Sequence, residues 1–285
     1  MEMSQEFCFC TLAVGKRYRH HARMLAQDIQ QYIPATALCI LTDEPEDFRE
    51  FTHVLAFKHR LQSVKGYHDK RFVLEKSLSL FNSCMFLDSD VRVIGAVEKP
   101  MNPLPGITAR TGCDLLHHIA NINSCKEIQV IEEVAQKLDI DIQKVQWFHE
   151  FMFFMRKQDE LEKKFFQFWE TISYFFETQG IYHGEGYAMG LAAEKVGLMI
   201  RFDREDKFPF FKDNIELIRI KNGQSDLQEK AIYFQMHQEI EYPKLSILRR
   251  IINKLIKHSI FLYRILRLKI LVQKDEKFHK LFGVS

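Results

Sequence analysis

The chain has 285 residues, of which 46% are hydrophobic and 27% charged, with only 12 Gly and 7 Pro. This composition excludes fibrous, collagen-like and disordered proteins, and the length allows a substantial buried core. The net charge of +2 is unevenly distributed: residues 244–274 carry nine Lys or Arg and no acid, and residues 275–285 are neutral overall, so residues 1–243 carry −7. An acidic body therefore precedes a basic C-terminal segment.

The cysteines and the first residues indicate a compartment. Six cysteines are present without a CxxC pair, and the chain opens with the polar, acidic MEMSQEF instead of a basic and apolar leader. We expect a reducing cytoplasm, with Cys8 and Cys10 as core thiols. No run of eighteen uncharged apolar residues exists, so no spanning helix is expected.

The first half alternates between strand and helix patterns. The predicted elements are a strand over 7–14, a helix that ends before Pro34, strands over 37–41 and 53–57, a helix over 69–81, and a strand over 84–87. This alternation predicts an α/β fold with a mainly parallel sheet, which binds ligands beyond the carboxyl ends of its strands. A loop with Pro100, Pro103, Pro105 and Gly106 marks the end of this half, near residue 110.

The second half continues with both kinds of pattern. The predicted elements are a helix around 128–138, a strand over 151–155, helices over 160–176 and 185–196, and strands over 198–202 and 231–236. The chain thus divides into residues 1–110 and 111–243, two halves of one domain, and a basic helical tail over 244–285.

The fourth predicted strand ends in Asp88-Ser89-Asp90. Two carboxylates separated by one residue project to the same side of a strand end, while Ser89 points away. Oxygen ligands on one side suit Mg²⁺ or Mn²⁺, which keeps positions open for diphosphate oxygens and neutralises charge as the diphosphate leaves. The pattern is typical of phosphate-ester or nucleotide-sugar chemistry, although DxD also occurs in loops that bind no metal.

The surrounding sequence carries a resemblance. The run CMFLDSDVRV, preceded by two strand–helix units, resembles the nucleotide-sugar-binding half of GT-A fold glycosyltransferases over roughly residues 7–240. The resemblance implies a GT-A-like, Rossmann-type sheet and a metal-dependent transfer of a sugar from a nucleotide-diphosphate donor, with a UDP-sugar favoured, to a hydroxyl of a glycan or lipid. It assigns Asp88 and Asp90 to Mn²⁺ or Mg²⁺. The opening CTLAVGKRY resembles the family's first strand and loop, which assigns Thr11 and Ala13 to the nucleoside.

Further site residues follow from the same resemblance. Lys70 and Arg71, before the DSD strand, match a basic position that contacts the donor nucleotide, or else they fill a solvated helix turn. The run HGEGYAMGLAAEKVGL resembles the acceptor-site motif and makes Glu185 the group that orients or deprotonates the acceptor, or else an acid that caps its helix. His237 completes the metal shell, as in retaining members, or is a loop residue. Gly186 stands where many inverting members have Asp, so retention and inversion both stay open.

Several candidates have weaker support. Glu150, before a predicted strand, is a second acceptor-site candidate. The pairs His20-His21 and His117-His118 have no partner at metal-ligand spacing and are expected at the surface.

Two other functions remain as alternatives. A haloacid-dehalogenase-type phosphatase also places DxD after an apolar strand, with Asp88 as nucleophile and Asp90 as acid and base, but that motif usually follows the first strand and precedes a later Gly-Asp pair, which is missing here. The third alternative is a non-catalytic, membrane-peripheral binding protein. The sequence has no P-loop, no GxGxxG after the first strand, no GxSxG and no HExxH, which argues against kinases, dehydrogenases, serine hydrolases and zinc proteases.

The basic tail has a helical pattern. Its apolar positions lie three, four or seven residues apart and are Leu245, Leu248, Ile252, Leu255, Leu262 and Leu266. A basic amphipathic helix of this kind lies in the interface of an anionic membrane, here at the cytoplasmic face, or packs on the acidic body. Nucleic acid is not expected as a partner, because the basic residues come with aliphatic side chains instead of aromatic platforms.

Overall fold

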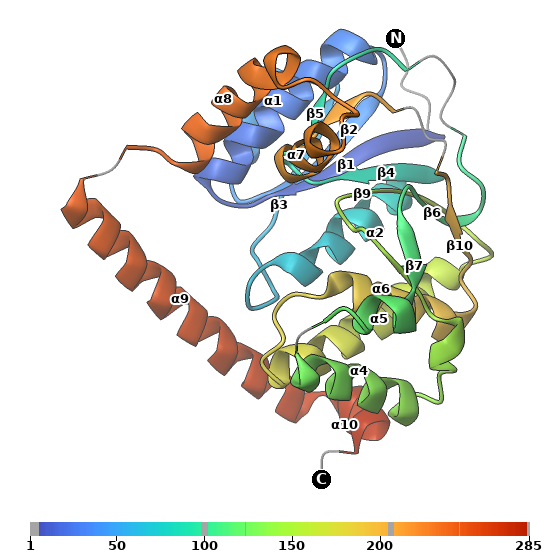
Figure 1. Ribbon diagram of the computed structural model, residues 1–285. Helices are drawn as coiled ribbons and strands as arrows, with labels where there is room; N and C mark the ends of the chain where they lie inside the picture. Colours follow the sequence, from blue (N-terminus) through green and yellow to red (C-terminus); the bar gives the residue numbers. More distant parts are fainter. Residues whose placement is uncertain (1–5, 98–101, 123, 205–207, 245, 284–285) are drawn as a thin grey trace.

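The computed structural model describes residues 6–97, 102–122, 124–204, 208–244 and 246–283. A central sheet of seven strands has the order β10-β6-β9-β4-β1-β2-β3 (Figure 1). These strands are β1 (Phe7–Ala13), β2 (Ala37–Thr42), β3 (Val54–Lys58), β4 (Ser83–Leu87), β6 (Gly106–Ala109), β9 (Met152–Arg156) and β10 (Ile200–Phe202). All neighbours pair in parallel except β9, which runs antiparallel to β4 and β6. The expected α/β fold with a mainly parallel sheet is confirmed.

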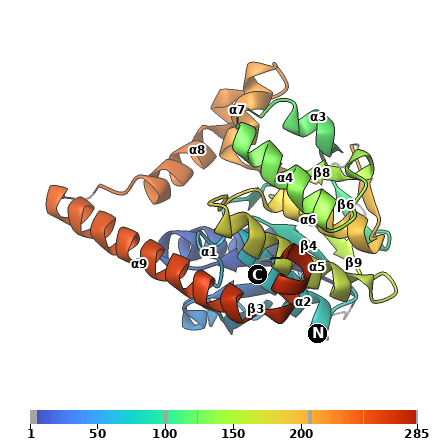
Figure 2. The same ribbon diagram turned by 90° about the horizontal axis from the view of Figure 1, so that it is seen from below.

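Helices cover both faces of the sheet, which explains why its inner strands are continuous apolar runs. Side chains of β1 alternate between the faces: Cys8 and Cys10 join one apolar cluster, and Phe9 and Ala13 join the other. One face packs against α1 (Lys16–Tyr32), and the other against α2 (Lys70–Leu80), α4 (Cys125–Lys137), α5 (Leu161–Thr178) and α6 (Glu185–Val196) (Figures 1 and 2). The predicted core thiols Cys8 and Cys10 are free and fully buried.

The best predicted helix of the second half is α5. Phe165, Trp169, Ile172 and Phe176 follow one another at helical spacing and are completely buried. The predicted helix over 185–196 is α6, which ends at Gly197 in the left-handed conformation, with φ of 73°. These two helices pack against each other beneath the sheet (Figure 1).

Short elements lie between the main strands and helices of both predicted halves. They are η1 (Pro45–Phe48), η2 (Tyr67–Asp69), β5 (Arg92–Val93), β7 (Gly112–Asp114), α3 (Leu115–Ile119), η3 (Ile142–Lys144), β8 (Gln146–Phe148) and β11 (Phe210–Phe211). Strands β5 and β11 form an antiparallel pair, as do β7 and β8. The predicted boundary near residue 110 follows β6, and because β9 and β10 from the second half join the same sheet, the halves share one core. Pro100, part of the predicted boundary loop, lies outside the described residues.

The last part of the chain is helical: α7 (Asp213–Lys221), α8 (Leu227–Glu241), α9 (Ile247–Lys274) and α10 (Glu276–Phe282). The strand predicted over 231–236 is therefore wrong. A short apolar run does not distinguish strand from helix by itself, and this one lies within a 15-residue helix whose start is capped by the Asp226 carboxylate. Among the described helices, none has both the length and the apolar character needed to cross a membrane.

Candidate functional site

The strand order reverses beside β1. The chain passes from β1 to β2 and β3 on one side, then returns to form β4 on the other side of β1. Open α/β sheets bind ligands beyond the carboxyl ends of their strands at such a switch point. The segment Asp88-Ser89-Asp90 follows β4 at this point, and the Asp88 amide donates a hydrogen bond of 2.8 Å to the Phe151 carbonyl. The fold thus places the predicted acids where sheets of this class bind ligands.

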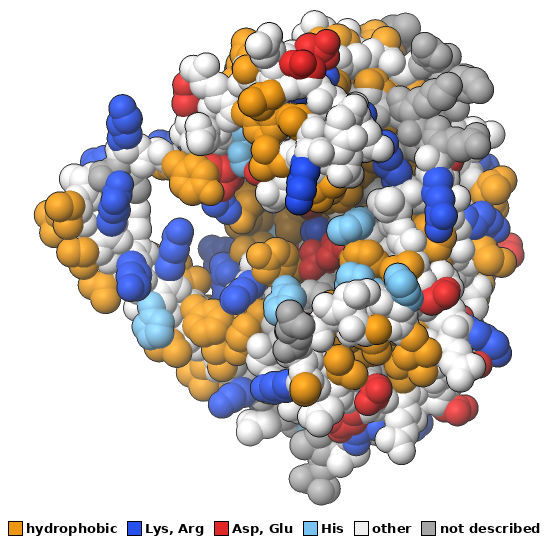
Figure 3. Space-filling view, in the orientation of Figure 1, with side chains coloured by type: hydrophobic (Ala, Val, Ile, Leu, Met, Phe, Trp, Pro, Cys, Tyr) orange, Lys and Arg blue, Asp and Glu red, His pale blue; other side chains and the backbone are white. Residues whose placement is uncertain are grey.

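Two lysine ammonium groups lie against the two carboxylates. Lys212, directly after β11, places its Nζ 2.6 Å from Asp90 Oδ1 and 3.3 Å from Asp88 Oδ2. Lys70, the first residue of α2, places its Nζ 3.0 Å from Asp88 Oδ1. Burial alone would lower the pKa of Lys212, but Asp88 and Asp90 raise it above its ordinary value. Figure 3 shows a hollow in the surface in which acidic, basic and histidine side chains lie close together.

Lys70 also links the DSD segment to α6. Its Nζ lies 2.9 Å from Glu185 Oε1 and donates to the Glu150 carbonyl at 3.2 Å. Burial would lower the pKa of Lys70, but the carboxylates of Asp88 and Glu185 raise it above its usual range. Burial would raise the pKa of Glu185, but Lys70 lowers it. Both side chains are buried and charged, so the alternative of a solvated helix turn is wrong for Lys70.

Arg71 takes a different direction. Its Nη1 lies 2.7 Å from Glu170 Oε1 on α5, and the residue is buried. Consecutive helical side chains point about 100° apart, so Lys70 and Arg71 do not face the same strand end. Arg71 is buried too, not solvated; it ties α2 to α5, and the structure does not bring it to the two aspartates.

The glycine after Glu185 has a steric reason. A Cβ at Gly186 would lie 2.6 Å from Trp147 Nε1 and 3.0 Å from the Phe148 carbonyl oxygen. A Cβ at Gly190, one turn on, would lie 2.3 Å from the Gln146 carbonyl oxygen. These two glycines allow α6 to pack closely on β8, and this packing leaves no room for a second acid at position 186.

Glu150 is a second carboxyl group beside the Lys70–Glu185 pair. It precedes β9, and its carbonyl accepts a hydrogen bond from Lys70. Burial, reinforced by the negative charge of Glu185, raises the pKa of Glu150 to about 8. At neutral pH Glu150 therefore carries a proton, whereas Glu185 is ionised.

His237 reaches the DSD segment from α8 and not from a strand. Its Nε2 lies 4.0 Å from Asp90 Oδ2, and its Nδ1 lies 3.7 Å from Asp213 Oδ2. Asp90 raises the pKa of His237 although burial opposes this. Burial would raise the pKa of Asp90, but His237 and Lys212 hold it far below its ordinary value. His237 is therefore close to Asp90, as the resemblance implies, and is not a loop residue.

The expected surface position of His21 is wrong. His21 is 2% exposed, and its Nε2 lies 3.1 Å from Glu241 Oε1. Its ring centroid lies 5.2 Å from that of His237. The physical reason is the packing of α8 on α1, which covers His21 (Figure 1). Its neighbour His20 is exposed, as expected.

The arrangement of donor atoms fits a divalent cation at Asp90. One ligand atom from each of Asp90, Asp213 and His237 lies within 4.8 Å of the other two. Ligands bound at about 2.0–2.6 Å from one ion lie roughly 3–5 Å apart, so these three require little movement. Asp88 is not part of this group. The ammonium of Lys212 lies between Asp88 and Asp90, so an ion shared by both aspartates requires Lys212 to move.

The two residues assigned to the nucleoside lie inside β1. Thr11 and Ala13 are completely buried, and the hydroxyl of Thr11 has no hydrogen-bond partner among the residues that the structure describes. The assignment of both residues to a nucleoside stays a prediction. The next glycine, Gly15, donates its amide hydrogen to Asp43 Oδ1 at 2.8 Å, which connects the ends of β1 and β2.

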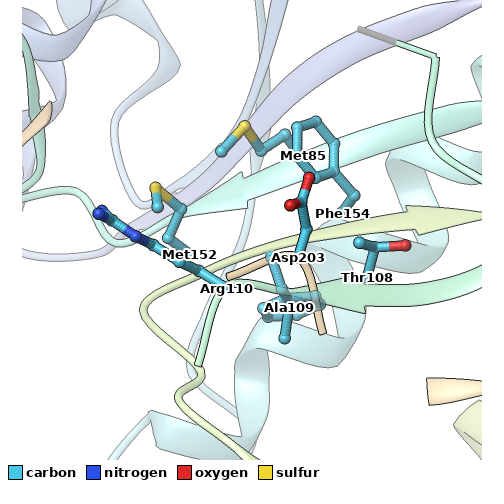
Figure 4. Close-up of a pocket in the computed structure, with 8 residues that line it drawn as sticks. Met85, Thr108, Ala109, Arg110, Met152, Phe154 and Asp203 are labelled. Carbon is cyan, nitrogen blue, oxygen red and sulfur yellow. The ribbon is translucent and has the colours of Figure 1, made fainter. Parts of the chain in front are cut away.

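A small pocket lies elsewhere, on β4, β9 and β6 (Figure 4). Its lining is mostly apolar and consists of Met85, Thr108, Ala109, Arg110, Met152, Phe153, Phe154 and Asp203. None of the residues of the DSD cluster lines it. We therefore base the candidate site on the charged cluster and not on this pocket.

The sequence alone did not reveal Lys212 and Asp213 as site residues. They are adjacent in FPFFKD, immediately after the short strand β11. The pairing of β11 with β5, which follows the DSD segment, brings them to Asp88 and Asp90. A two-residue strand gives no recognisable period, so only the fact that a Lys-Asp pair follows an apolar run could have drawn attention to them.

The sequence matches no protein-family model, and comparison with curated proteins finds no similar sequence.

Proposed function

We propose that this protein is a metal-dependent glycosyltransferase with a GT-A-like fold, which transfers a sugar from a nucleotide-diphosphate donor to a hydroxyl of a glycan or lipid. The observation that carries the proposal is the convergence of two aspartates, two lysines, a histidine and two glutamates from distant segments at the switch point of the sheet. An acidic pair with two lysine ammonium groups beside it suits a diphosphate held with a metal ion better than it suits a neutral ligand.

Asp90, His237 and Asp213 are the residues that would hold Mn²⁺ or Mg²⁺. When bound, the cation supplies positive charge that stabilises the departing diphosphate. His237 presents only one nitrogen to an ion: its Nε2 lies near Asp90 and its Nδ1 near Asp213, so Asp213 would have to turn a carboxylate oxygen from Nδ1 toward the ion to join Asp90 and Nε2 as a ligand. Asp88, the other predicted ligand, keeps Lys70 and Lys212 in place and approaches the ion only when Lys212 moves.

The two lysines are the candidates for contact with the donor. The ammonium of Lys70 is buried and that of Lys212 is partly buried, both lie beside carboxylates, and both remain charged at physiological pH. A diphosphate that arrives with its cation offers them new anionic partners, so Lys212 exchanges the aspartates for phosphate oxygens. Arg71 is not assigned to the donor, because it is paired with Glu170.

Glu185 and Glu150 have different proposed roles at the acceptor hydroxyl. Glu185 is held ionised by Lys70 and so orients the acceptor hydroxyl and Lys70. Glu150, whose pKa is raised to about 8, is the better group for proton transfer because its pKa is close to the operating pH, although only its ionised form, the minor one at neutral pH, accepts the proton of the acceptor hydroxyl. The resemblance made Glu185 the first candidate for deprotonating the acceptor and Glu150 the second; we propose the opposite order for proton transfer.

A screen of donors tests the proposal. UDP-, GDP- and CMP-sugars are added with Mn²⁺, and thermal unfolding is measured; a donor at a hundredfold excess over its dissociation constant stabilises the fold by about 2.7 kcal/mol. Metal-dependent hydrolysis of the stabilising donor is then measured in Asp90→Asn and Asp88→Asn, with Asp114→Asn as a control of equal charge change. We expect Asp90→Asn to lose Mn²⁺ binding more completely than Asp88→Asn.

The alternatives give different results in the same assays. A haloacid-dehalogenase-type phosphatase would hydrolyse a phosphomonoester in preference to a nucleotide-sugar, and a non-catalytic binding protein would hydrolyse neither. Full metal-dependent activity in both aspartate variants would refute the assignment of the site.

A further inference from the structure

The long helix α9 is attached to the body by only half of its length. Every residue from Ile247 to Ile260 is exposed, and Figure 1 shows this part of the helix extending away from the body. The second half packs on the main core through Phe261, Ile265, Leu268 and Val272. The expected alternative, a tail packed on the body, is therefore correct for only one part of the tail.

The face of α9 that packs on the body is not its main apolar face. A second row of aliphatic and aromatic side chains continues along the whole helix, three, four or seven residues apart, and stays exposed. It consists of Leu248, Ile252, Leu255, Leu262, Leu266 and Ile270, flanked by Ile251, Ile256 and Tyr263, and we call it the α9 stripe. Leu255 and Leu266 are 63% and 58% exposed. Leu245, predicted in the same row, lies outside the described residues.

The two faces are separated because a helix advances about 100° per residue. Leu262 follows Phe261 by one residue and Leu266 precedes Leu268 by two, which are rotations of about 100° and 200° around the helix, so the two stripe residues point away from the two core residues. In Figure 3 apolar side chains follow the outer edge of α9, while several Lys and Arg side chains point from it toward the body. Contiguous exposed apolar surface of this size marks an interaction site.

The charge of the helix identifies the partner. Between Ile247 and Lys274 the helix carries eight Lys or Arg and no acid. Two copies of α9 paired through their stripes would bring these like charges together. An anionic bilayer, in contrast, receives the apolar stripe at the boundary between headgroups and acyl chains and attracts the positively charged helix as a whole.

We propose that the α9 stripe docks this protein in the plane of an anionic lipid bilayer, with the acidic body held away from the lipid surface. The body, with a net charge of −7 before residue 244, is repelled by anionic headgroups. The first half of α9 extends away from the body, so its stripe can contact the membrane while the body stays at a distance from the lipid (Figure 1). This inference does not depend on glycosyl transfer, because it rests on α9 alone.

Vesicle binding by the full chain tests the proposal. Sedimentation with large vesicles of phosphatidylcholine containing about one third phosphatidylglycerol is compared with pure phosphatidylcholine vesicles, at low and high salt. We expect binding to the anionic vesicles, and weaker binding at high salt and without phosphatidylglycerol. The variant Ile252→Glu/Leu255→Glu should bind at least about tenfold more weakly.

A matched control separates the stripe from a change of net charge. Leu104→Glu/Met199→Glu adds the same two charges at exposed apolar positions outside the tail, 60% and 49% exposed, and should bind as the unchanged protein does. All four substituted positions are exposed, so thermal unfolding should be nearly the same in each protein. Equal binding by the stripe variant and the control would overturn the proposal. The proposal would also be overturned if the protein did not bind anionic vesicles and instead formed a dimer in analytical ultracentrifugation that the stripe variant abolishes.

Discussion

Replacing Lys212 by Met should strengthen metal binding at the DSD segment. In the structure the Lys212 ammonium occupies the space between Asp88 and Asp90, 3.3 Å and 2.6 Å from their oxygens. A divalent cation at Asp90 competes with that ammonium. Methionine has a similar length and no charge, so the variant leaves the aspartates in place with Lys70 beside Asp88 but without the ammonium between Asp88 and Asp90.

The distances give the size of the effect. At an effective dielectric constant of about 20, one unit charge attracts another by about 6 kcal/mol at 2.6 Å and about 5 kcal/mol at 3.3 Å. Desolvation cancels most of this attraction, and a hydrogen bond to a charged group contributes a net of about 1.5–3 kcal/mol. Because about 1.4 kcal/mol corresponds to a factor of ten, the affinity for Mn²⁺ should rise roughly ten- to a hundredfold in Lys212→Met.

Calorimetric titration with Mn²⁺ in the absence of nucleotide measures this affinity. The control is Lys144→Met, which removes the same charge from an exposed lysine on η3. In Lys212→Met the affinity for the nucleotide-sugar should fall, because the same ammonium is proposed to bind the diphosphate. The reasoning fails if Lys212→Met binds Mn²⁺ no more tightly than the unchanged protein and Lys144→Met.

Two further substitutions test other parts of the site. Glu150 has a pKa of about 8 in the folded protein and close to 4.5 in the unfolded chain. Its contribution to the free energy of unfolding is therefore complete below pH 4.5. As the pH rises from 4.5 to 8, this contribution is lost, by at most about 5 kcal/mol. Glutamine does not titrate, so Glu150→Gln should gain thermal stability relative to the unchanged protein as the pH rises from 5 to 9. If the melting temperatures of both proteins change with pH in the same way, the raised pKa of Glu150 is contradicted. Gly186→Ala gains about 1 kcal/mol of helix propensity, yet its Cβ would collide with Trp147 and the Phe148 carbonyl, so we expect a net loss of about 1–2 kcal/mol, measured by denaturant unfolding. Gly95→Ala, whose Cβ would meet Pro209 at 3.3 Å, is the milder comparison.

The central sheet could be predicted because burial on both faces leaves a clear pattern. The strand over 84–87 is apolar at every position after Ser83, since Cys84 and Phe86 face one core and Met85 and Leu87 the other. The acids that follow it mark its carboxyl end. A parallel sheet requires such ends to lie together, so the place of Asp88 and Asp90 in the fold followed from local sequence.

The rest of the site could not be predicted because it depends on contacts between distant segments. His21 and Glu241 are 220 residues apart, and they meet only because α8 packs on α1. Lys212 is 122 residues from Asp90. The run AIYFQM has the aromatic and β-branched composition of a strand, and only the capped helix around it, with Tyr233 and Phe234 packed on Phe211, decides otherwise.

The tail and the site are connected through one loop. Arg267 of α9 donates hydrogen bonds to the carbonyls of Leu61 and Gln62. The amide of Gln62 in turn donates to the buried carboxylate of Asp69 at 2.6 Å. Asp69 immediately precedes Lys70, whose ammonium lies between Asp88 and Glu185. The anchoring of α9 on the body and the position of Lys70 are therefore set by the same hydrogen-bonded loop, so the proposed membrane contact of α9 would act on a segment that also fixes Lys70, the lysine proposed to bind the donor.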